Sequence, residues 1–152
     1  MTWIEEARAL SDRLVAWRRD IHMYPELGFH EVRTASIVAD ELQRLGYQVQ
    51  TGVAETGVVG WLESGVPGPT VLLRFDMDCL PLQEENEVPY KSRYDGQMHA
   101  CGHDGHTTML LGLARYLVQT YAPDARGRTL EVRIDDFSVE PQGLEGLGAP
   151  VA

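Results

Sequence analysis

The sequence has few cysteines and no long apolar run. Only Cys79 and Cys101 occur among 152 residues, which argues against a disulfide framework and leaves a buried thiol or a thiolate ligand as the role of each. No stretch approaches the roughly 20 apolar residues that span a bilayer, and the first residues carry acids where a signal peptide has its apolar region. These absences predict a cytoplasmic protein with no membrane partner.

Basic residues are also scarce. The chain has 13 lysines and arginines against 23 acidic residues, so its formal net charge is −10. A surface this acidic repels phosphate backbones, and we therefore expect no nucleic-acid partner. Hydrophobic residues make up 43% of the chain, which is ordinary for a globular protein and sufficient for one domain with a core.

The spacing of apolar residues predicts an α/β layered domain. Three- and four-residue steps indicate helices, and short apolar or alternating runs indicate strands. The continuous apolar runs favour helices packed on a mixed, largely parallel sheet that is covered on both faces. The predicted helices are 4–22, 31–45 and 105–120, and the predicted strands are 47–53, 57–62, 70–75 and 129–134.

The character of the chain changes after Ile134. The segment 135–152 has few periodic apolar residues and many glycines, prolines and acids. We therefore divide the chain into a layered domain over 1–134 and an irregular tail over 135–152.

Three histidines, a cysteine and an aspartate fall within the eight residues 99–106. Thiolate sulfur and imidazole nitrogen are preferred ligands of zinc and similar ions, and Gly102 allows Cys101 and His103 to point the same way. Asp104 could be a further ligand or could orient an imidazole. Spacing alone leaves a solvated turn open as well, because one loop supplies too few ligands.

Two carboxylates follow the predicted strand 70–75. Asp76 and Asp78 alternate along the chain, so they face one way if the strand continues. Ligand sites gather at the carboxyl ends of strands in α/β sheets, where such a pair could bind a cation or hold a metal-ligating histidine. An ordinary polar strand end fits equally well. We interpret Cys79 as a packing residue and His22 as a structural or surface histidine.

Together these segments resemble one family, the dinuclear-metal amidohydrolases of the aminoacylase and carboxypeptidase group, which includes hippurate hydrolase and the indole-acetyl-amino-acid hydrolases. The resemblance implies a hydrolase that cleaves the amide bond of N-acyl amino acids or small peptides with two zinc or manganese ions. It implies that Cys101 and His103 are metal ligands and that Asp78 is a catalytic carboxylate supporting the metal. The matching segments are 18–22, 25–27, 74–78, 80–81 and 99–106.

The resemblance ends before the family pattern is complete. The family continues with a Gln-Pro-Ala-Glu-Glu-Gly motif that holds the general base, whereas 134–146 contains no Glu-Glu pair. An ungapped register aligns Val139 and Glu140 with the two glutamates of the motif. A gapped register aligns Leu144 and Glu145 with them. The lid domain is absent, and no histidine follows His106.

These departures lead us to expect an incomplete catalytic domain. A truncation or frameshift near Arg126 would explain a familiar first part followed by an unfamiliar tail. The chain is then a weakly active or inactive hydrolase by descent, and whether it is an enzyme by itself stays open. The alternatives are a non-enzymatic metal-binding or interaction protein and a non-functional fragment. The sequence does not fix the oligomeric state, the metal or the acyl group.

Overall fold

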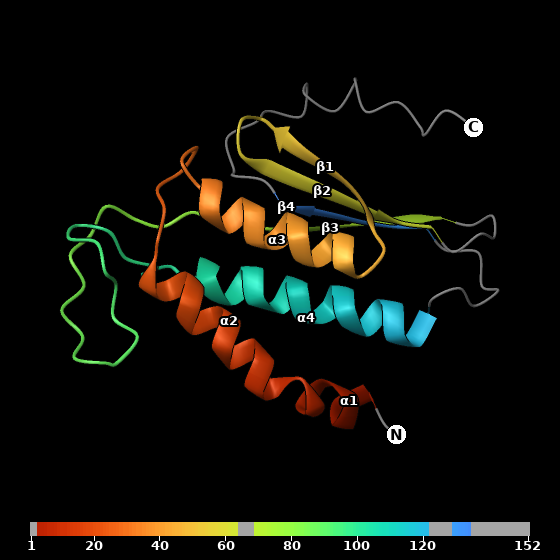
Figure 1. Ribbon diagram of the computed structural model, residues 1–152, viewed down its shortest axis with the longest axis horizontal. Helices are drawn as coiled ribbons and strands as arrows, with labels where there is room; N and C mark the ends of the chain where they lie inside the picture. The colour runs from red at the N-terminus through yellow and green to blue at the C-terminus, as the bar shows by residue number, and fades with distance from the viewer. Residues whose placement is uncertain (1–2, 64–68, 122–128, 135–152) are drawn as a thin grey trace.

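The computed structural model describes residues 3–63, 69–121 and 129–134, which form one layer of helices against a four-stranded sheet (Figure 1). Helices α3 and α4 pack directly on the sheet, and α1 and α2 pack on α4. The elements in chain order are α1 (Trp3–Ala9), α2 (Ser11–Met23), α3 (Val32–Arg44), β1 (Gln48–Val53), β2 (Gly57–Leu62), β3 (Thr70–Phe75), α4 (His103–Tyr121) and β4 (Thr129–Ile134).

The single helix predicted over 4–22 is two helices, α1 and α2, which is a correction to the sequence analysis. The chain leaves helical pairing around Leu10, where the hydroxyl of Ser11 donates to the carbonyl oxygen of Arg8 at 2.5 Å. A serine side chain that hydrogen-bonds the preceding turn competes with the helical backbone bond and is common at such interruptions. The apolar spacing continues across the break, so periodicity alone did not reveal it.

The sheet is mixed, as predicted, with the strand order β1-β2-β4-β3. It is not largely parallel among the described strands, because β1–β2 and β2–β4 are antiparallel and only β3–β4 is parallel. The residues between β1 and β2 form a tight hairpin in which Ala54 and Glu55 have φ values of 49° and 82°. A connection this short can join only antiparallel strands, whereas α4 provides the long crossover that a parallel pair requires.

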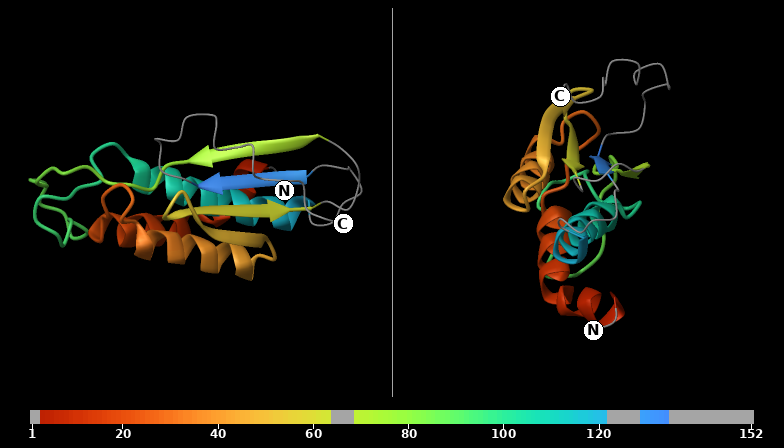
Figure 2. Two further views of the ribbon diagram at one scale, coloured as in Figure 1. Left: turned by 90° about the horizontal axis from the view of Figure 1, so that it is seen from above. Right: turned by 90° about the vertical axis from the view of Figure 1, so that its right-hand side faces the viewer.

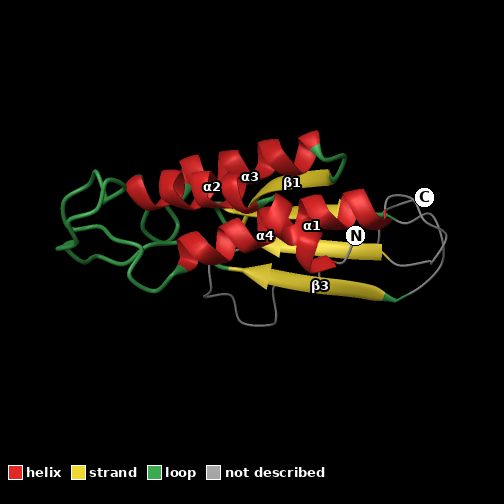
Figure 3. Ribbon diagram, turned by 90° about the horizontal axis from the view of Figure 1, so that it is seen from below, coloured by secondary structure: helices red, strands yellow, loops and turns green. Residues whose placement is uncertain are grey.

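The described helices all lie on one side of the sheet (Figures 2 and 3). We expected cover on both faces, but the described part of the chain has no second helical layer. On β3, Leu72 points away from the face of the core-packed Phe75 and is 50% exposed. A sheet with antiparallel pairings tolerates one face in water, which explains why apolar strands misled the prediction. No described helix is long and apolar enough to cross a membrane.

The core lies between α3, α4 and the sheet. Its buried members come mainly from the inward faces of the two helices and from β2. They are Ala35, Val38, Ala39, Leu42, Tyr47, Val58, Met77, Leu110, Leu111 and Ala114. The tail predicted over 135–152, with Val139, Glu140, Leu144 and Glu145, lies outside the described residues.

This architecture brings the carboxyl end of β3 to the first turn of α4. Two isolated bridges stabilise the intervening chain, one pairing Leu27 with Cys79 and one pairing Leu80 with Met98. The hydroxyl of Thr107 in α4 also donates to the carbonyl oxygen of Asp76 at 3.2 Å. Residues that are about 25 positions apart in sequence therefore face one another across this edge of the sheet.

Helix α3 offers a matched test of the core. Val38 is fully buried and Val32, on the same helix, is 70% exposed. We expect Val38→Ala to lower the free energy of unfolding by about 2 kcal/mol, because it removes two buried methyl groups and leaves a cavity. Val32→Ala should change it by less than about 0.5 kcal/mol. Urea unfolding of both variants measures the difference, and equal losses would contradict this core.

Candidate metal centre

Three side chains at the edge of the sheet bring metal-binding atoms together. Asp76, His103 and His106 each offer one ligand atom, and these atoms all lie within 4.8 Å of one another. Asp76 follows β3, while His103 and His106 are three residues apart in the first turn of α4 and so share a helical face. Their rings stack with centroids 5.2 Å apart. Two imidazoles and a carboxylate are a donor set that zinc accepts in open, catalytic-type sites.

Asp78 holds one of these imidazoles. Its Oδ1 atom lies 2.6 Å from Nδ1 of His103, and its backbone oxygen lies 3.1 Å from the same nitrogen. When Nδ1 donates to Asp78, Nε2 keeps the lone pair that can bind a metal. The sequence analysis assigned His103 as a ligand and Asp78 as its supporting carboxylate, and the two side chains lie where those roles require. The roles themselves stay predictions.

Cys101 lies apart from this group. Its thiol is free and its side chain is exposed in the loop before α4. Within the described part of the chain, no group of three or more potential donors includes it. Gly102, at φ 91°, takes the left-handed conformation as the chain turns into the helix, and its carbonyl accepts from the amides of Gly105 and His106. The assignment of Cys101 as a ligand therefore also stays a prediction.

Asp76 and His106 were not among the ligands assigned from the sequence. The three-residue spacing of the two histidines was the available signal, because it places both on one helical face. The other cysteine behaves as predicted. Cys79 is a buried packing residue, and burial, with the nearby charge of Asp78, raises the pKa of its thiol to about 11. It is therefore protonated at neutral pH.

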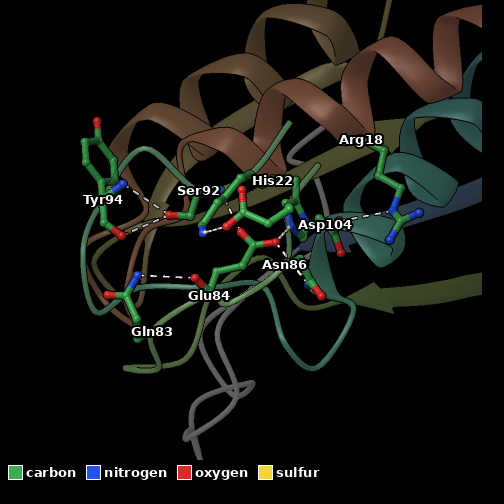
Figure 4. A network of polar contacts seen from close by, with 10 residues as sticks. Arg18, His22, Gln83, Glu84, Asn86, Ser92, Tyr94 and Asp104 are labelled. Atoms are coloured by element: carbon green, nitrogen blue, oxygen red, sulfur yellow. Dashed lines mark hydrogen bonds and ion pairs between the residues drawn. The ribbon is translucent and has the colours of Figure 1, made fainter. Parts of the chain in front are cut away.

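A buried polar network joins α2 and the loop that contains Glu84 to the first turn of α4 (Figure 4). His22 in α2 contacts Asp104 of α4 through Nδ1 at 2.9 Å and Glu84 through Nε2 at 3.2 Å. The Nε of Arg18 donates to the same oxygen of Asp104 at 3.1 Å. Side chains of His22, Asp104 and Glu84 are at most 8% exposed. His22, which the sequence analysis interpreted as a structural or surface histidine, is thus buried in a polar network. The sequence analysis assigned no role to Glu84, because nothing in the polar segment 83–97 distinguishes it from its neighbours.

The network keeps both carboxylates ionised. Burial alone would raise the pKa of Asp104, but its hydrogen bond with His22 and the nearby charges outweigh this and lower it. Burial likewise opposes ionisation of Glu84, and the backbone N–H of Ser92 with the contact to His22 lowers its pKa below 4.5. Burial lowers the pKa of the neighbouring His99 to about 4, so that ring is neutral at pH 7.

The lowered pKa of Glu84 predicts how stability responds to acid. A carboxylate with a depressed folded-state pKa stabilises the fold above its unfolded pKa, and this contribution is lost as pH falls through the folded value. Glu84→Gln lacks the contribution at every pH. We therefore expect the wild type to have the higher Tm at pH 7, with the gap narrowing as the pH falls below 4.5. Thermal unfolding from pH 7 to pH 3 measures it, and a constant gap would contradict the assignment.

Known proteins match this chain over most of its length. It is 50% identical over 117 residues to hippurate hydrolase of Campylobacter jejuni, a match that covers 77% of this chain and 30% of that protein. It is 47% identical over 115 residues to thermostable carboxypeptidase 1 of Saccharolobus solfataricus, covering 75% and 29%. It is 51% identical over 106 residues to IAA-amino acid hydrolase ILR1-like 2 of Arabidopsis thaliana, covering 70% and 24%. The chain thus spans less than a third of each relative.

Solved structures agree with these relatives. The YXEP protein of Bacillus subtilis, described as a dinuclear metal binding peptidase from the M20 family, has a TM-score of 0.76 at 36% identity, covering 84% of this chain and 35% of that one. An aminobenzoyl-glutamate utilization protein from Klebsiella pneumoniae has a TM-score of 0.65 at 31% identity, covering 86% and 38%.

A sequence model of Peptidase family M20/M25/M40 matches residues 72–133. That range contains the last four residues of β3, the loop with Asp76 and Asp78, and the whole of α4 with its two histidines. The profile match, the relatives and the fold all lead to one assignment. The chain belongs to the M20 family of metal-dependent amidohydrolases and peptidases and corresponds to the N-terminal part of its members.

Proposed function

We propose that this chain binds a divalent metal, zinc or manganese, in a site built for hydrolysing the amide bond of N-acyl amino acids or small peptides. The observation that carries the proposal is the pairing of His103 with Asp78 at 2.6 Å, beside Asp76 and His106. A metal-ligating histidine commonly donates its second nitrogen to a carboxylate, which fixes the tautomer and orients the ring. An imidazole held in this way next to two further donors supports metal binding.

The residues would divide the chemistry between them. His103, His106 and Asp76 would hold the ion through nitrogen and oxygen atoms, and Cys101 would add a sulfur ligand if its loop turns toward them. Asp78 would keep the Nε2 lone pair of His103 directed at the ion. A bound divalent ion supplies polarisation of the scissile carbonyl and a more acidic water.

The substrate class comes from the relatives. Their names describe hydrolysis of hippurate, of amino-acid conjugates of IAA, and of peptides from the carboxyl end. The first two substrates are N-acyl amino acids and the third is a peptide, so one amide joined to an amino acid is common to all. Because this chain spans less than a third of those proteins, their full activity is a proposal here.

We further propose that the 152-residue chain hydrolyses such substrates weakly or not at all. The segment 135–152 contains no Glu-Glu pair, and no histidine follows His106. Those groups would supply the general base and the remaining ligands of a two-ion site. Each missing catalytic group typically costs about 10²–10⁴-fold in rate.

Zinc titration tests the metal site. We expect the double variant Cys101→Ala with His103→Ala to bind zinc at least about 100-fold more weakly than the wild type, since loss of a direct ligand exceeds the 10–100-fold cost of losing an outer partner. His30→Ala is the matched control, because His30 is exposed and lies outside the group of donors. Isothermal calorimetry measures all three affinities. Equal affinities in the wild type and the double variant would remove the site.

Hydrolysis tests the activity. We expect no measurable release of glycine from hippurate by the purified chain with added zinc or manganese, because the base and the later ligands are missing. Chromatographic detection of glycine measures it, with the metal salts alone as control. Robust turnover that depends on the metal would contradict the expectation.

A non-enzymatic metal-binding protein is the second candidate, and it is favoured by the fact that three donors converge within one chain. Substrate binding discriminates between the two. If the site descends from a hydrolase and still accepts substrate, hippurate should shift the visible spectrum of the cobalt-loaded protein. A site that only binds metal should keep its spectrum when hippurate is added.

A further inference from the structure

A distant loop is connected through buried side chains to Asp104, which follows the metal donor His103 in the first turn of α4 (Figure 4). The connection begins at Glu84, whose side chain is 1% exposed although its loop is otherwise polar. One carboxylate oxygen accepts from the backbone N–H of Ser92 at 2.6 Å. The other contacts His22 and the side-chain amide of Asn86, each at 3.2 Å. Glu84 therefore attaches the loop to α2 through a fully used carboxylate.

The connection continues from α2 into the first turn of α4. His22 contacts Asp104 with its other ring nitrogen at 2.9 Å, and Arg18 contacts the same carboxylate. Asp104 is fully buried and follows His103 directly. Its backbone oxygen accepts from the hydroxyl of Thr108 at 2.7 Å, one turn further along α4.

We infer that Glu84 is a positioning residue for the metal donors, acting through His22 and Asp104. The inference rests on the proposed function. His103 is fixed from two directions: Asp78 orients its ring, and Asp104 holds the adjacent backbone in place. The carboxylates of Glu84 and Asp104 hold the two ring nitrogens of His22 from opposite sides, at 3.2 and 2.9 Å. Glu84 therefore fixes the ring orientation from which His22 reaches Asp104.

The variant Glu84→Gln keeps the size of the side chain, so it weakens the contact with His22 without opening a cavity. Glutamine has one acceptor oxygen where glutamate has two, so it cannot accept from both Ser92 and His22. If its oxygen serves Ser92, its NH₂ group faces Nε2 of His22 in place of the carboxylate oxygen that contacts this nitrogen in the wild type. Asp104 would keep Arg18 but would face a less firmly oriented His22, and the first turn of α4 would be held less firmly.

The test compares Glu84→Gln with Glu85→Gln, an identical change at the adjacent, exposed glutamate. The first readout needs no metal. Solvent exchange of the amides of Gly105 and His106, which donate to Gly102 at the start of α4, is measured by NMR. We expect these two amides to exchange faster in Glu84→Gln, with the amides of α3 unchanged. Glu85→Gln should match the wild type throughout.

The second readout is metal binding. We expect Glu84→Gln to bind Co²⁺ about tenfold more weakly than Glu85→Gln, at the lower end of the cost for outer-shell partners, and to show a shifted visible spectrum. Asn86→Ala removes only one hydrogen bond to Glu84 and should move both readouts in the same direction by less. This variant carries the test if Glu84→Gln does not fold.

The outcomes separate this inference from the proposed function. Unchanged exchange at Gly105 and His106 with unchanged Co²⁺ affinity would overturn the positioning role while leaving the metal site intact. Faster exchange throughout α3 as well would make Glu84 a residue of general stability and would also overturn the inference. If the wild type binds no Co²⁺ but the local exchange responds as expected, the link from Glu84 to α4 holds and the proposed metal function fails.

Discussion

The structure depends on two carboxylate contacts that hold the first turn of α4, one on the side of the sheet and one on the side of α2. On the sheet side, Asp78 contacts the ring of His103 at 2.6 Å. On the α2 side, Asp104 is buried against His22 and Arg18. Removing one partner from a buried network of charges lowers the free energy of unfolding by more than the contact itself contributes, because the remaining charge is left without compensation. The position of the imidazoles at this turn is therefore determined by interactions from β3, α2 and the loop around Glu84 together.

The topology explains why these groups meet. β3 and β4 are parallel, so α4 must run back across the sheet between them and begin near the carboxyl end of β3. Asp76 and Asp78 follow that strand end, and the histidines open the helix, which brings acids and imidazoles together at one edge. The β1–β2 hairpin widens the sheet and supplies buried residues such as Val58 but contributes nothing to this edge.

Local patterns in the sequence were sufficient for much of this fold. The predicted strands 57–62, 70–75 and 129–134 agree with β2, β3 and β4, and Asp78 and His103, both chosen from the sequence, lie in contact. The break at Leu10 and the antiparallel pairing of β2 with β4 could not be predicted, because a hydroxyl contact and the pairing of distant strands are not encoded in apolar spacing. The short connection between β1 and β2 was the available signal for their antiparallel pairing. Glu84 could not be recognised either. A buried glutamate in a polar loop differs from its exposed neighbour Glu85 only through partners that are distant in sequence.

The electrostatics of this edge argue for carboxylates as the deciding ligands. The N-terminus of α4 carries partial positive charge, which disfavours a cation beside His103 and His106. Asp76 and Asp78 offset this charge, but Arg74 lies 3.0 Å from Asp76 and already neutralises part of it. Neutral imidazoles add no negative charge. A divalent ion at this turn would therefore gain its electrostatic stabilisation mainly from Asp76, in competition with Arg74, while Asp78 acts through the orientation of His103.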